Sequence, residues 1–346
     1  MVSTTPSTTM HVGELAFHAA KVFTGLHEAL DPSTAQPVGP KEELLAYAVS
    51  VGAATAVMMV LLLLVRSVGV TIAVYGFRFP NWYKDRYGAN RLAKKTKSFR
   101  DAFVEMTYYT SSLLASLKIC WGAAWFWPSG WAHVMYDGRV QMDPSCPPYT
   151  IPADLKFLYV METSYYLASF TLLVLQRLRK ETRKDFVEMA AHHVITAGLL
   201  SLSFVTGYVR IGAVVMFLHN VFDPFLHAAK LTHYVKFPLL PDVFFASCAL
   251  TFLVSRLIYY PWAIWHAWFG VCVGNDTCPG GVWDKTPVEY SLIGLLIALI
   301  PIHVFWFYLI LKVLQKALMS SGVQGDVRSD SEDEDEDQAP PRTKSE

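Results

Sequence analysis

The stretch RKDFVEMAAHHVITAGLLSLSFVTGYVRIGAVVMFLHNVFDPFLHAAK, Arg183–Lys230, contains the features from which the fold class follows. It starts with three charged residues and continues as two apolar runs joined by a short turn. The first run carries the adjacent pair His192 and His193, and the second carries His219 and Asp223. An ionisable side chain at membrane depth is costly and by default marks a functional site. We therefore interpret the rest of the chain as a scaffold for this stretch.

The composition indicates a membrane protein. Of the 346 residues, 53% are hydrophobic and only 17% are charged, and the mean hydropathy is +0.30. Soluble domains carry about 25% charged residues. Several apolar runs exceed about 18 residues, which is long enough for a helix to span a bilayer. We predict an all-α polytopic membrane protein with about seven transmembrane helices, at 44–65, 106–127, 155–175, 188–206, 211–230, 242–268 and 288–314.

The loops between these helices differ in charge, which predicts their orientation. Short cytoplasmic loops carry an excess of Lys and Arg. The loops after the first and third expected helices are strongly basic, and the loops that alternate with them are not. We therefore expect a lumenal N-terminal arm at 1–43, a first transmembrane anchor at 44–75 and a cytosolic C-terminus. We see no removable signal peptide.

The loop at 269–287, before the last expected helix, has two features of a lumenal segment. Asn275 begins an Asn-Asp-Thr sequence, which is a glycosylation acceptor unless the match is due to chance. Cys272 and Cys278 flank it, and an oxidising lumen permits a disulfide between them, with two free thiols as the alternative. Glycosylation at Asn275 and a Cys272–Cys278 disulfide are therefore candidates.

The C-terminal tail, 319–346, is acidic and is expected to be disordered. Ser329 and Ser331 are each followed three residues later by Glu, a pattern typical of acidophilic kinase sites. Both serines are candidates for phosphorylation, which would add further negative charge. A plain solvated tail is the alternative.

Helix geometry predicts that the four ionisable groups of the central stretch meet. At 1.5 Å per residue, His192 and His193 lie roughly 6–8 Å from the cytosolic end of their helix, and Asp223 and His219 roughly 10–17 Å from that end of theirs. A short turn makes the two helices antiparallel neighbours. Pro224 removes a backbone hydrogen bond and kinks the second helix, which leaves a carbonyl that a polar cavity would satisfy.

Several chemistries remain open at this point. The five cysteines show no zinc-like spacing, and the histidine clusters of a diiron oxygenase are absent. A zinc hydrolase needs three ligands, which one of the paired histidines, His219 and Asp223 could supply. In acyl transfer, a neutral imidazole acts as a general base or is itself acylated, and Asp223 holds the ring. The basic rim suits a phosphate-bearing donor such as acyl-CoA, although the positive-inside rule alone also explains it.

For the other polar groups within the expected helices, a structural role is an alternative to a functional one. We interpret His227, His266 and His303 as interfacial or interhelical residues. Lys118, Glu162 and Arg256 are intramembrane charges that either form structural pairs or line a cavity, and the sequence does not decide between these roles.

The central stretch resembles the signature of ceramide synthases, the longevity-assurance proteins of the TLC-domain superfamily. The resemblance covers about residues 98–337, and it includes Ser255-Arg256-Leu257, Pro261-Trp262 and the acidic segment 326–332. Two positions depart from the family pattern: Asn220 stands where many members carry Asp, and His227 where many carry Glu. The positions that match the signature are Arg183, Lys184, Asp185, Phe186, Glu188, Met189, His192, His193, Thr196, Ser203, Arg210, Gly212, His219, Asp223, Leu226, Ala229 and Lys230.

The resemblance implies an N-acyltransferase of the endoplasmic-reticulum membrane. It would transfer a fatty acyl group from acyl-CoA to the amine of a sphingoid base such as sphinganine, forming ceramide or dihydroceramide. It implies a catalytic TLC domain at 98–318, with six helices packed around a lipid tunnel. It assigns catalysis to His192, His193, His219 and Asp223, and substrate binding or support to Arg183, Lys184, Asp185, Asn220, Lys230 and Arg256.

The expected partners are acyl-CoA, the sphingoid base, membrane lipids and, in a homodimer or heterodimer, another synthase chain. We expect no nucleic-acid partner, no metal and no bound cofactor beyond acyl-CoA as co-substrate. The alternative from another class is a non-catalytic TLC-domain protein that binds or senses lipid.

Overall fold

The computed structural model describes residues 40–77, 84, 89–133, 151–179, 185–269 and 287–319. Every element of secondary structure in these ranges is helical, which confirms the predicted all-α class. The elements are α2 (Pro40–Thr71), η2 (Ile72–Gly76), α4 (Ala89–Cys120), η3 (Ala124–Phe126), η4 (Pro128–His133), α5 (Ala153–Leu178), α6 (Phe186–Val205), α7 (Val209–Asn220), α8 (Asp223–Tyr234), α9 (Leu240–Phe252), η6 (Leu253–Tyr259), α10 (Tyr260–Phe269) and α11 (Pro287–Met319).

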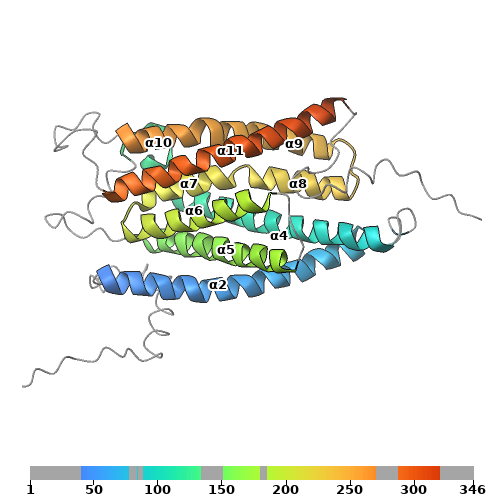
Figure 1. Ribbon diagram of the computed structural model, residues 1–346, viewed down its shortest axis with the longest axis horizontal. Coiled ribbons are helices and arrows are strands. Elements are labelled where there is room, and N and C mark those ends of the chain that lie inside the picture. The colour runs from blue at the N-terminus through green and yellow to red at the C-terminus, as the bar shows by residue number, and fades with distance from the viewer. Residues whose placement is uncertain are drawn as a thin grey trace, which may run out of the picture.

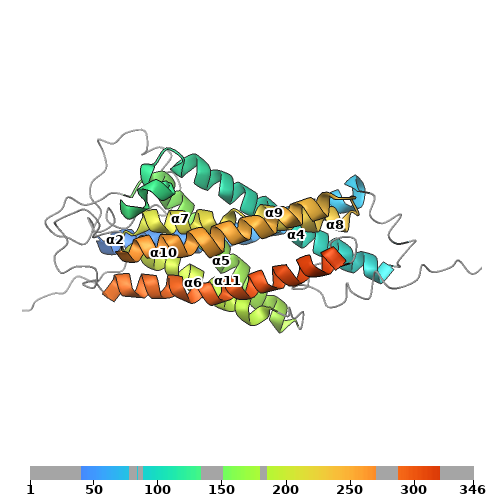
Figure 2. The same cartoon turned by 90° about the horizontal axis from the view of Figure 1, so that it is seen from above.

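The long helices lie side by side along the longest axis of the molecule (Figure 1). Helix α2 packs against α4 and α5 on one side of the bundle, and α11 packs against α6 and α9 on the other. Helices α7 and α8 follow each other end to end through the middle. The view from above shows α4 crossing the bundle obliquely (Figure 2). The successive segments α6, α7–α8, α9–α10 and α11 alternate in direction, so the start of α6 and the end of α8 lie at the same end of the molecule (Figure 1).

Six of the described helical segments are long and apolar enough to cross a membrane. They are Leu45–Gly76, Ala153–Leu178, Phe186–Val205, Val209–Tyr234, Leu240–Phe269 and Pro287–Ala317. Each corresponds to an expected transmembrane helix, and together they form the bundle of a polytopic membrane protein.

The second expected helix, 106–127, differs from the structure in both bounds. Helix α4 begins earlier, at Ala89, and ends at Cys120, and it is not among the six apolar segments. It ends early because the chain turns after Cys120 into two short 3₁₀ segments. There the Trp127 indole nitrogen donates a hydrogen bond to the Trp121 carbonyl at 2.9 Å, and the two rings pack edge to face. Its earlier start reflects a basic first half that is helical without being apolar.

The turn that makes α6 and α7 antiparallel neighbours depends on a glycine. Helix α6 ends with the Thr206 amide bonded to the Leu202 carbonyl, and Gly207 follows with a φ of 80°. This left-handed conformation is the usual way to end a helix, and glycine adopts it without a steric penalty. The turn predicted between the two histidine-bearing helices is therefore confirmed.

Tyr159 ties α5 to this turn from inside the bundle. Its ring is fully buried, and its hydroxyl donates to the Val209 carbonyl at 3.1 Å and lies 3.1 Å from the Ser203 hydroxyl. Gly212 packs directly beside the same hydroxyl, and a Cβ atom at Gly212 would overlap it. Only glycine permits this close approach of α7 to α5.

We expect Gly212→Ala to lower the free energy of unfolding by about 1–3 kcal/mol, because the added methyl group overpacks the contact with Tyr159. Thermal unfolding of the purified protein in detergent measures the effect. Gly198→Ala in α6 is the matched control, since its Cβ would meet no atom within 4 Å, and alanine favours a helix. An unchanged midpoint for Gly212→Ala would contradict this account of the packing.

Candidate active site

The helix that carries His219 is interrupted just before Pro224, where the sequence predicted a kink. Helix α7 ends at Asn220 and α8 begins at Asp223, with Pro224 in its first turn. A broken helix leaves backbone carbonyls that need partners inside the membrane. The carbonyl of His219 accepts a hydrogen bond of 2.6 Å from the guanidinium of Arg256. The polar group that satisfies this break is therefore a side chain from a different helix.

Arg256 is buried between α7, α8 and its own helix. It lies in η6, a stretch of π-helix between α9 and α10. Such stretches are uncommon and are often found at functional sites. Its guanidinium donates to Asp223 Oδ2 at 3.1 Å and lies over the rings of Phe222 and Phe252, at 4.1 and 5.3 Å from their centroids. Pairing with a carboxylate and with aromatic faces lowers the cost of burying its charge.

A histidine pair extends the site from α7 to α11. Nδ1 of His219 lies 2.8 Å from the Val215 carbonyl, and its Nε2 lies 3.1 Å from Nε2 of His303. A carbonyl only accepts, so Nδ1 of His219 carries the hydrogen and the lone pair of the neutral ring is on Nε2. Nε2 of His303 then donates. The backbone of α7, rather than Asp223, thus fixes the tautomer of His219.

The paired histidines of α6 face the same region, as predicted, but only one approaches His219. The His192 and His219 rings are nearly parallel with centroids 6.1 Å apart. His193 Nδ1 bonds to the Met189 carbonyl of its own helix at 2.7 Å. Nδ1 of His192 is buried and has no hydrogen-bond partner within the described residues. His192 is therefore the member of the pair whose imidazole is available at the centre of the site.

Aromatic rings enclose the histidines. Tyr166 of α5 lies 5.8 Å from His192 and 5.6 Å from His193, measured between ring centroids. Trp306 of α11 lies 5.1 Å from His192, and Tyr260 of α10 lies 5.0 Å from His219. These rings exclude water from the site, where electrostatic interactions are then stronger than in solvent.

A second polar network lies behind His219 and explains one departure from the family signature. The amide nitrogen of Asn220 donates to the Ser112 hydroxyl at 2.8 Å and to Glu162 Oε1 at 2.9 Å, and the Ser112 hydroxyl donates to the same oxygen. All three residues are buried. Glu162, whose role the sequence left open, is thus a structural partner of the residue next to His219.

The other departure, His227, lies apart from the histidine centre. Its Nε2 is 3.1 Å from Glu105 Oε2 of α4, and its ring stacks on Tyr109 with centroids 5.8 Å apart. It therefore joins α4 to α8, in agreement with its interpretation as an interhelical residue.

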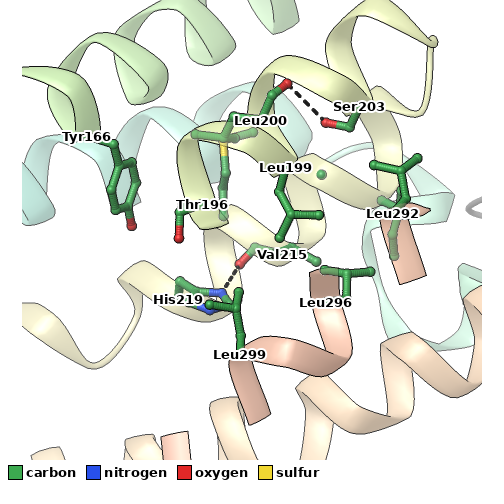
Figure 3. A pocket seen from close by; sticks show the side chains of 13 residues that line it. Tyr166, Thr196, Leu199, Leu200, Ser203, Val215, His219, Leu292, Leu296 and Leu299 are labelled. Carbon is green, nitrogen blue, oxygen red and sulfur yellow. Dashed lines mark hydrogen bonds between the residues drawn. The ribbon is translucent and has the colours of Figure 1, made fainter. Parts of the chain in front are cut away.

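An apolar pocket leads away from His219 towards the turn between α6 and α7. Its cavity volume is about 40 Å³, and its lining is apolar except for His219 and three hydroxyl groups. Figure 3 shows His219 at one end, with Tyr166 and Thr196 beside it, and Ser203 and Leu292 towards the other end. The lining residues are Tyr166 from α5; Thr196, Leu199, Leu200 and Ser203 from α6; Ile211, Gly212, Val215, Met216 and His219 from α7; and Leu292, Leu296 and Leu299 from α11.

The sequence did not identify His303 as part of the site. Its interpretation as an interhelical residue is confirmed, because His303 of α11 is completely buried and its Nε2 lies 3.1 Å from Nε2 of His219 on α7; its place in the histidine centre is what the sequence does not reveal. Tyr166 and Trp306 were not considered at all. A histidine two residues after Pro301, in the apolar middle of the helix, is the available signal, but it does not reveal which neighbouring helix α11 contacts.

The remaining predicted residues lie outside this centre or outside the described ranges. Asp185 is buried immediately before α6, where its carbonyl accepts from the Met189 amide, and Lys230 is half-buried in α8. Within the described part of the chain, no group of three or more His, Cys, Asp or Glu residues is arranged to hold a metal ion. The described residues do not include Arg183, Lys184, Cys272, Asn275, Cys278, Ser329 or Ser331, the N-terminal arm at 1–39, or the tail from 320.

Together, the fold and the site define a class of protein. It is a helical membrane bundle with buried histidines beside an apolar pocket. The family model described as TLC domain matches residues 98–312, and the chain belongs to this family.

Three curated proteins that are similar to this chain are each described as a ceramide synthase. The chain is 30% identical over 271 residues to "Ceramide synthase LOH1" of Arabidopsis thaliana, covering 77% of this chain and 83% of the relative. It is 31% identical over 262 residues to "Ceramide synthase 5" of Homo sapiens, covering 74% and 60%. It is 31% identical over 250 residues to "Ceramide synthase 1 LOH3" of Arabidopsis thaliana, covering 70% and 77%. The resemblance noted in the sequence is thus confirmed over most of the chain.

We expect Arg256→Met to destabilise the protein by about 3–5 kcal/mol, because it leaves the Asp223 carboxylate buried without its cation. The double variant Arg256→Met/Asp223→Asn should recover part of this loss. Unfolding of the purified variants in detergent measures both. Arg100→Met is the control: its ion pair with Asp101 is partly exposed, so the change should be below about 1 kcal/mol. If Arg256→Met and Arg100→Met lowered the free energy of unfolding equally, the role given to Arg256 would be contradicted.

Proposed function

We propose that this protein is a ceramide synthase that transfers a fatty acyl group from acyl-CoA to the amine of a sphingoid base. The observation that carries the proposal is the apolar pocket that ends at His219, beside the available imidazole of His192. Its lining suits a hydrocarbon chain, and its polar end suits the reacting carbonyl group. The names of the relatives support the same reaction.

His192 is the residue we propose as base or acyl carrier. In direct attack, the amine nitrogen adds to the thioester carbonyl carbon while His192 accepts the proton from nitrogen. The carbon–sulfur bond then breaks, and His192 returns the proton to sulfur, which gives the amide and free CoA. In the covalent route, a ring nitrogen of His192 forms the acyl bond first and CoA leaves as the thiol. The amine then displaces the imidazole, which restores the enzyme.

The other polar groups have supporting roles in this proposal. His219 and His303 hold each other in fixed orientations against one side of the site. Asp223 acts through Arg256, since the guanidinium that it binds also holds the His219 carbonyl. A fixed arrangement of this kind accelerates a reaction because the reacting groups need little reorganisation.

We propose further that the protein resides in the endoplasmic-reticulum membrane, with its N-terminus in the lumen and its C-terminus in the cytosol. The support is the excess of Lys and Arg at 84–100 and 177–184. Among the described residues, the start of α4 and the end of α5 lie at the same end of the bundle (Figure 1). His192, in the first half of α6, then lies nearer to the side of the membrane where acyl-CoA is found. Dimer formation with another synthase chain belongs to the same proposal.

For the reaction, purified protein given sphinganine and a mixture of acyl-CoA chain lengths should form the amides, detected by lipid mass spectrometry. His192→Ala should lower kcat by about 10²–10⁴, the contribution of a general base. His266→Ala in α10 is the control, because this histidine neither lines the pocket nor contacts the other histidines. Full turnover by His192→Ala would refute the site assignment.

Two further results of that experiment separate the alternatives. Intact mass after addition of acyl-CoA alone should rise by one acyl group if His192 is a carrier, and stay unchanged if the amine attacks directly. No amide with any chain length would favour a lipid-binding protein without catalysis.

For the orientation, Asn275→Gln tests the lumenal side. If 270–286 is lumenal and Asn275 is glycosylated, the wild-type protein expressed in eukaryotic cells should migrate more slowly than Asn275→Gln. Glycosidase treatment should remove the difference. Cysteine residues introduced at position 90 and position 280 and labelled with an impermeant reagent provide a second measurement. Labelling of position 90 from the lumen would contradict the proposed orientation.

A further inference from the structure

Two hydroxyl groups lie at the polar end of the pocket without a role in the histidine centre. Thr196 is four residues after His192 in α6, so the two side chains are on the same face of the helix. Tyr166 enters from α5. Figure 3 shows both side chains on the side of the pocket where His219 lies. Both residues line the pocket and are more than nine-tenths buried.

Thr196 and Thr110 are the two threonines in the described helices whose hydroxyl is buried without a hydrogen-bond partner, and of the two only Thr196 lines the pocket. A threonine in a helix commonly donates to the carbonyl four residues earlier. Thr171, Thr206 and Thr232 do so, at 2.8, 2.6 and 2.7 Å. Oγ1 of Thr196 is buried and has no hydrogen-bond partner among the described residues. An unpaired buried hydroxyl is destabilising, and a hydrogen bond to a ligand oxygen would offset this cost.

A comparison with Ser203 shows where that ligand oxygen belongs. Ser203 lines the pocket farther from His219, and its hydroxyl is already bonded to the Leu200 carbonyl and to Tyr159. The rest of the lining between Thr196 and Ser203 is aliphatic. The pocket therefore offers an unused hydrogen-bond donor only at its polar end, within the part of its lining described here. A chain in the pocket would carry its polar atom there.

We propose that the hydroxyls of Thr196 and Tyr166 bind the carbonyl oxygen of the acyl group and stabilise the negative charge that develops on it. This proposal rests on acyl transfer as the function. When the nucleophile adds to the carbonyl carbon, the π electrons of the carbonyl bond move to oxygen, and both hydroxyls donate to that oxygen. When the carbonyl bond re-forms, the electron pair of the carbon–sulfur bond leaves with sulfur, which gains a proton. Both residues are catalytic in this scheme, because they touch the reacting atoms.

The test compares variants of the full-length protein that remove or keep the donor. Thr196→Val has nearly the same shape and no hydroxyl, and Tyr166→Phe removes the second donor. We expect each to lower kcat by about 10²–10³ with little change in KM, as the loss of one oxyanion donor does. Thr196→Ser keeps the donor and should retain most of the activity. Thr196→Val should unfold at the same or a higher temperature than wild type, because an unpaired buried hydroxyl is removed.

Ser116→Ala is the matched control. The Ser116 hydroxyl is also buried and unpaired among the described residues, but it does not line the pocket. This variant should leave kcat unchanged. If Thr196→Val and Tyr166→Phe both kept the wild-type kcat, the proposal would be overturned while the acyl-transfer function stood.

A second measurement does not depend on turnover. The His192→Ala protein is mixed with acyl-CoA labelled with ¹³C at the carbonyl carbon, using palmitoyl-CoA if no chain length is turned over. Difference infrared spectroscopy should show the bound carbonyl stretch at lower frequency than in detergent alone. Introducing Thr196→Val into the His192→Ala protein should reverse most of this frequency shift. An inactive wild-type protein that still shows the reversible shift would refute acyl transfer but keep the oxygen-binding site, and the absence of any shift would overturn the site.

Discussion

The bond between Arg256 and the broken turn of α7 and α8 is the constraint on which the site depends. A guanidinium inside a membrane bundle must be paired, and a broken helix inside a membrane must have its carbonyls satisfied. One side chain meets both requirements, because Arg256 binds the Asp223 carboxylate and the His219 carbonyl together. The interaction fixes the end of α7, and with it the imidazole of His219. Its removal would therefore release the histidine as well as the charge.

This break also separates two environments along one helical segment. Before it, α7 is regular and its side chains Ile211, Val215 and Met216 form a wall of the apolar pocket. At and after it, the neighbours are histidines, Arg256 and the Asn220 network. A substrate with a hydrocarbon chain and a polar reacting group is divided in the same way. The boundary between the two environments is where we place the reaction.

Much of this arrangement follows from local rules that a sequence carries. Helix rise and a short turn predicted that His192 and His219 would meet, and Pro224 predicted an interruption of the second helix. The early end of α4 was not predicted, because it depends on how Trp121 and Trp127 pack after Cys120. His303 was not recognised either. Its contact joins residues 84 positions apart, and the rotation of α11 that creates it is decided by packing against the whole bundle.

The departure from the family signature at position 220 has a physical consequence for the buried acidic groups. At position 220, an amide can donate where a carboxylate cannot, and Asn220 gives both amide hydrogens to Ser112 and Glu162. A carboxylate there would face the buried Glu162 side chain and would have to share a proton with it. The amide thus keeps a single acidic group behind His219 and removes a competing proton acceptor from the vicinity of the histidines. This setting agrees with our proposal that His192, and not the residue at position 220, carries the proton transfer.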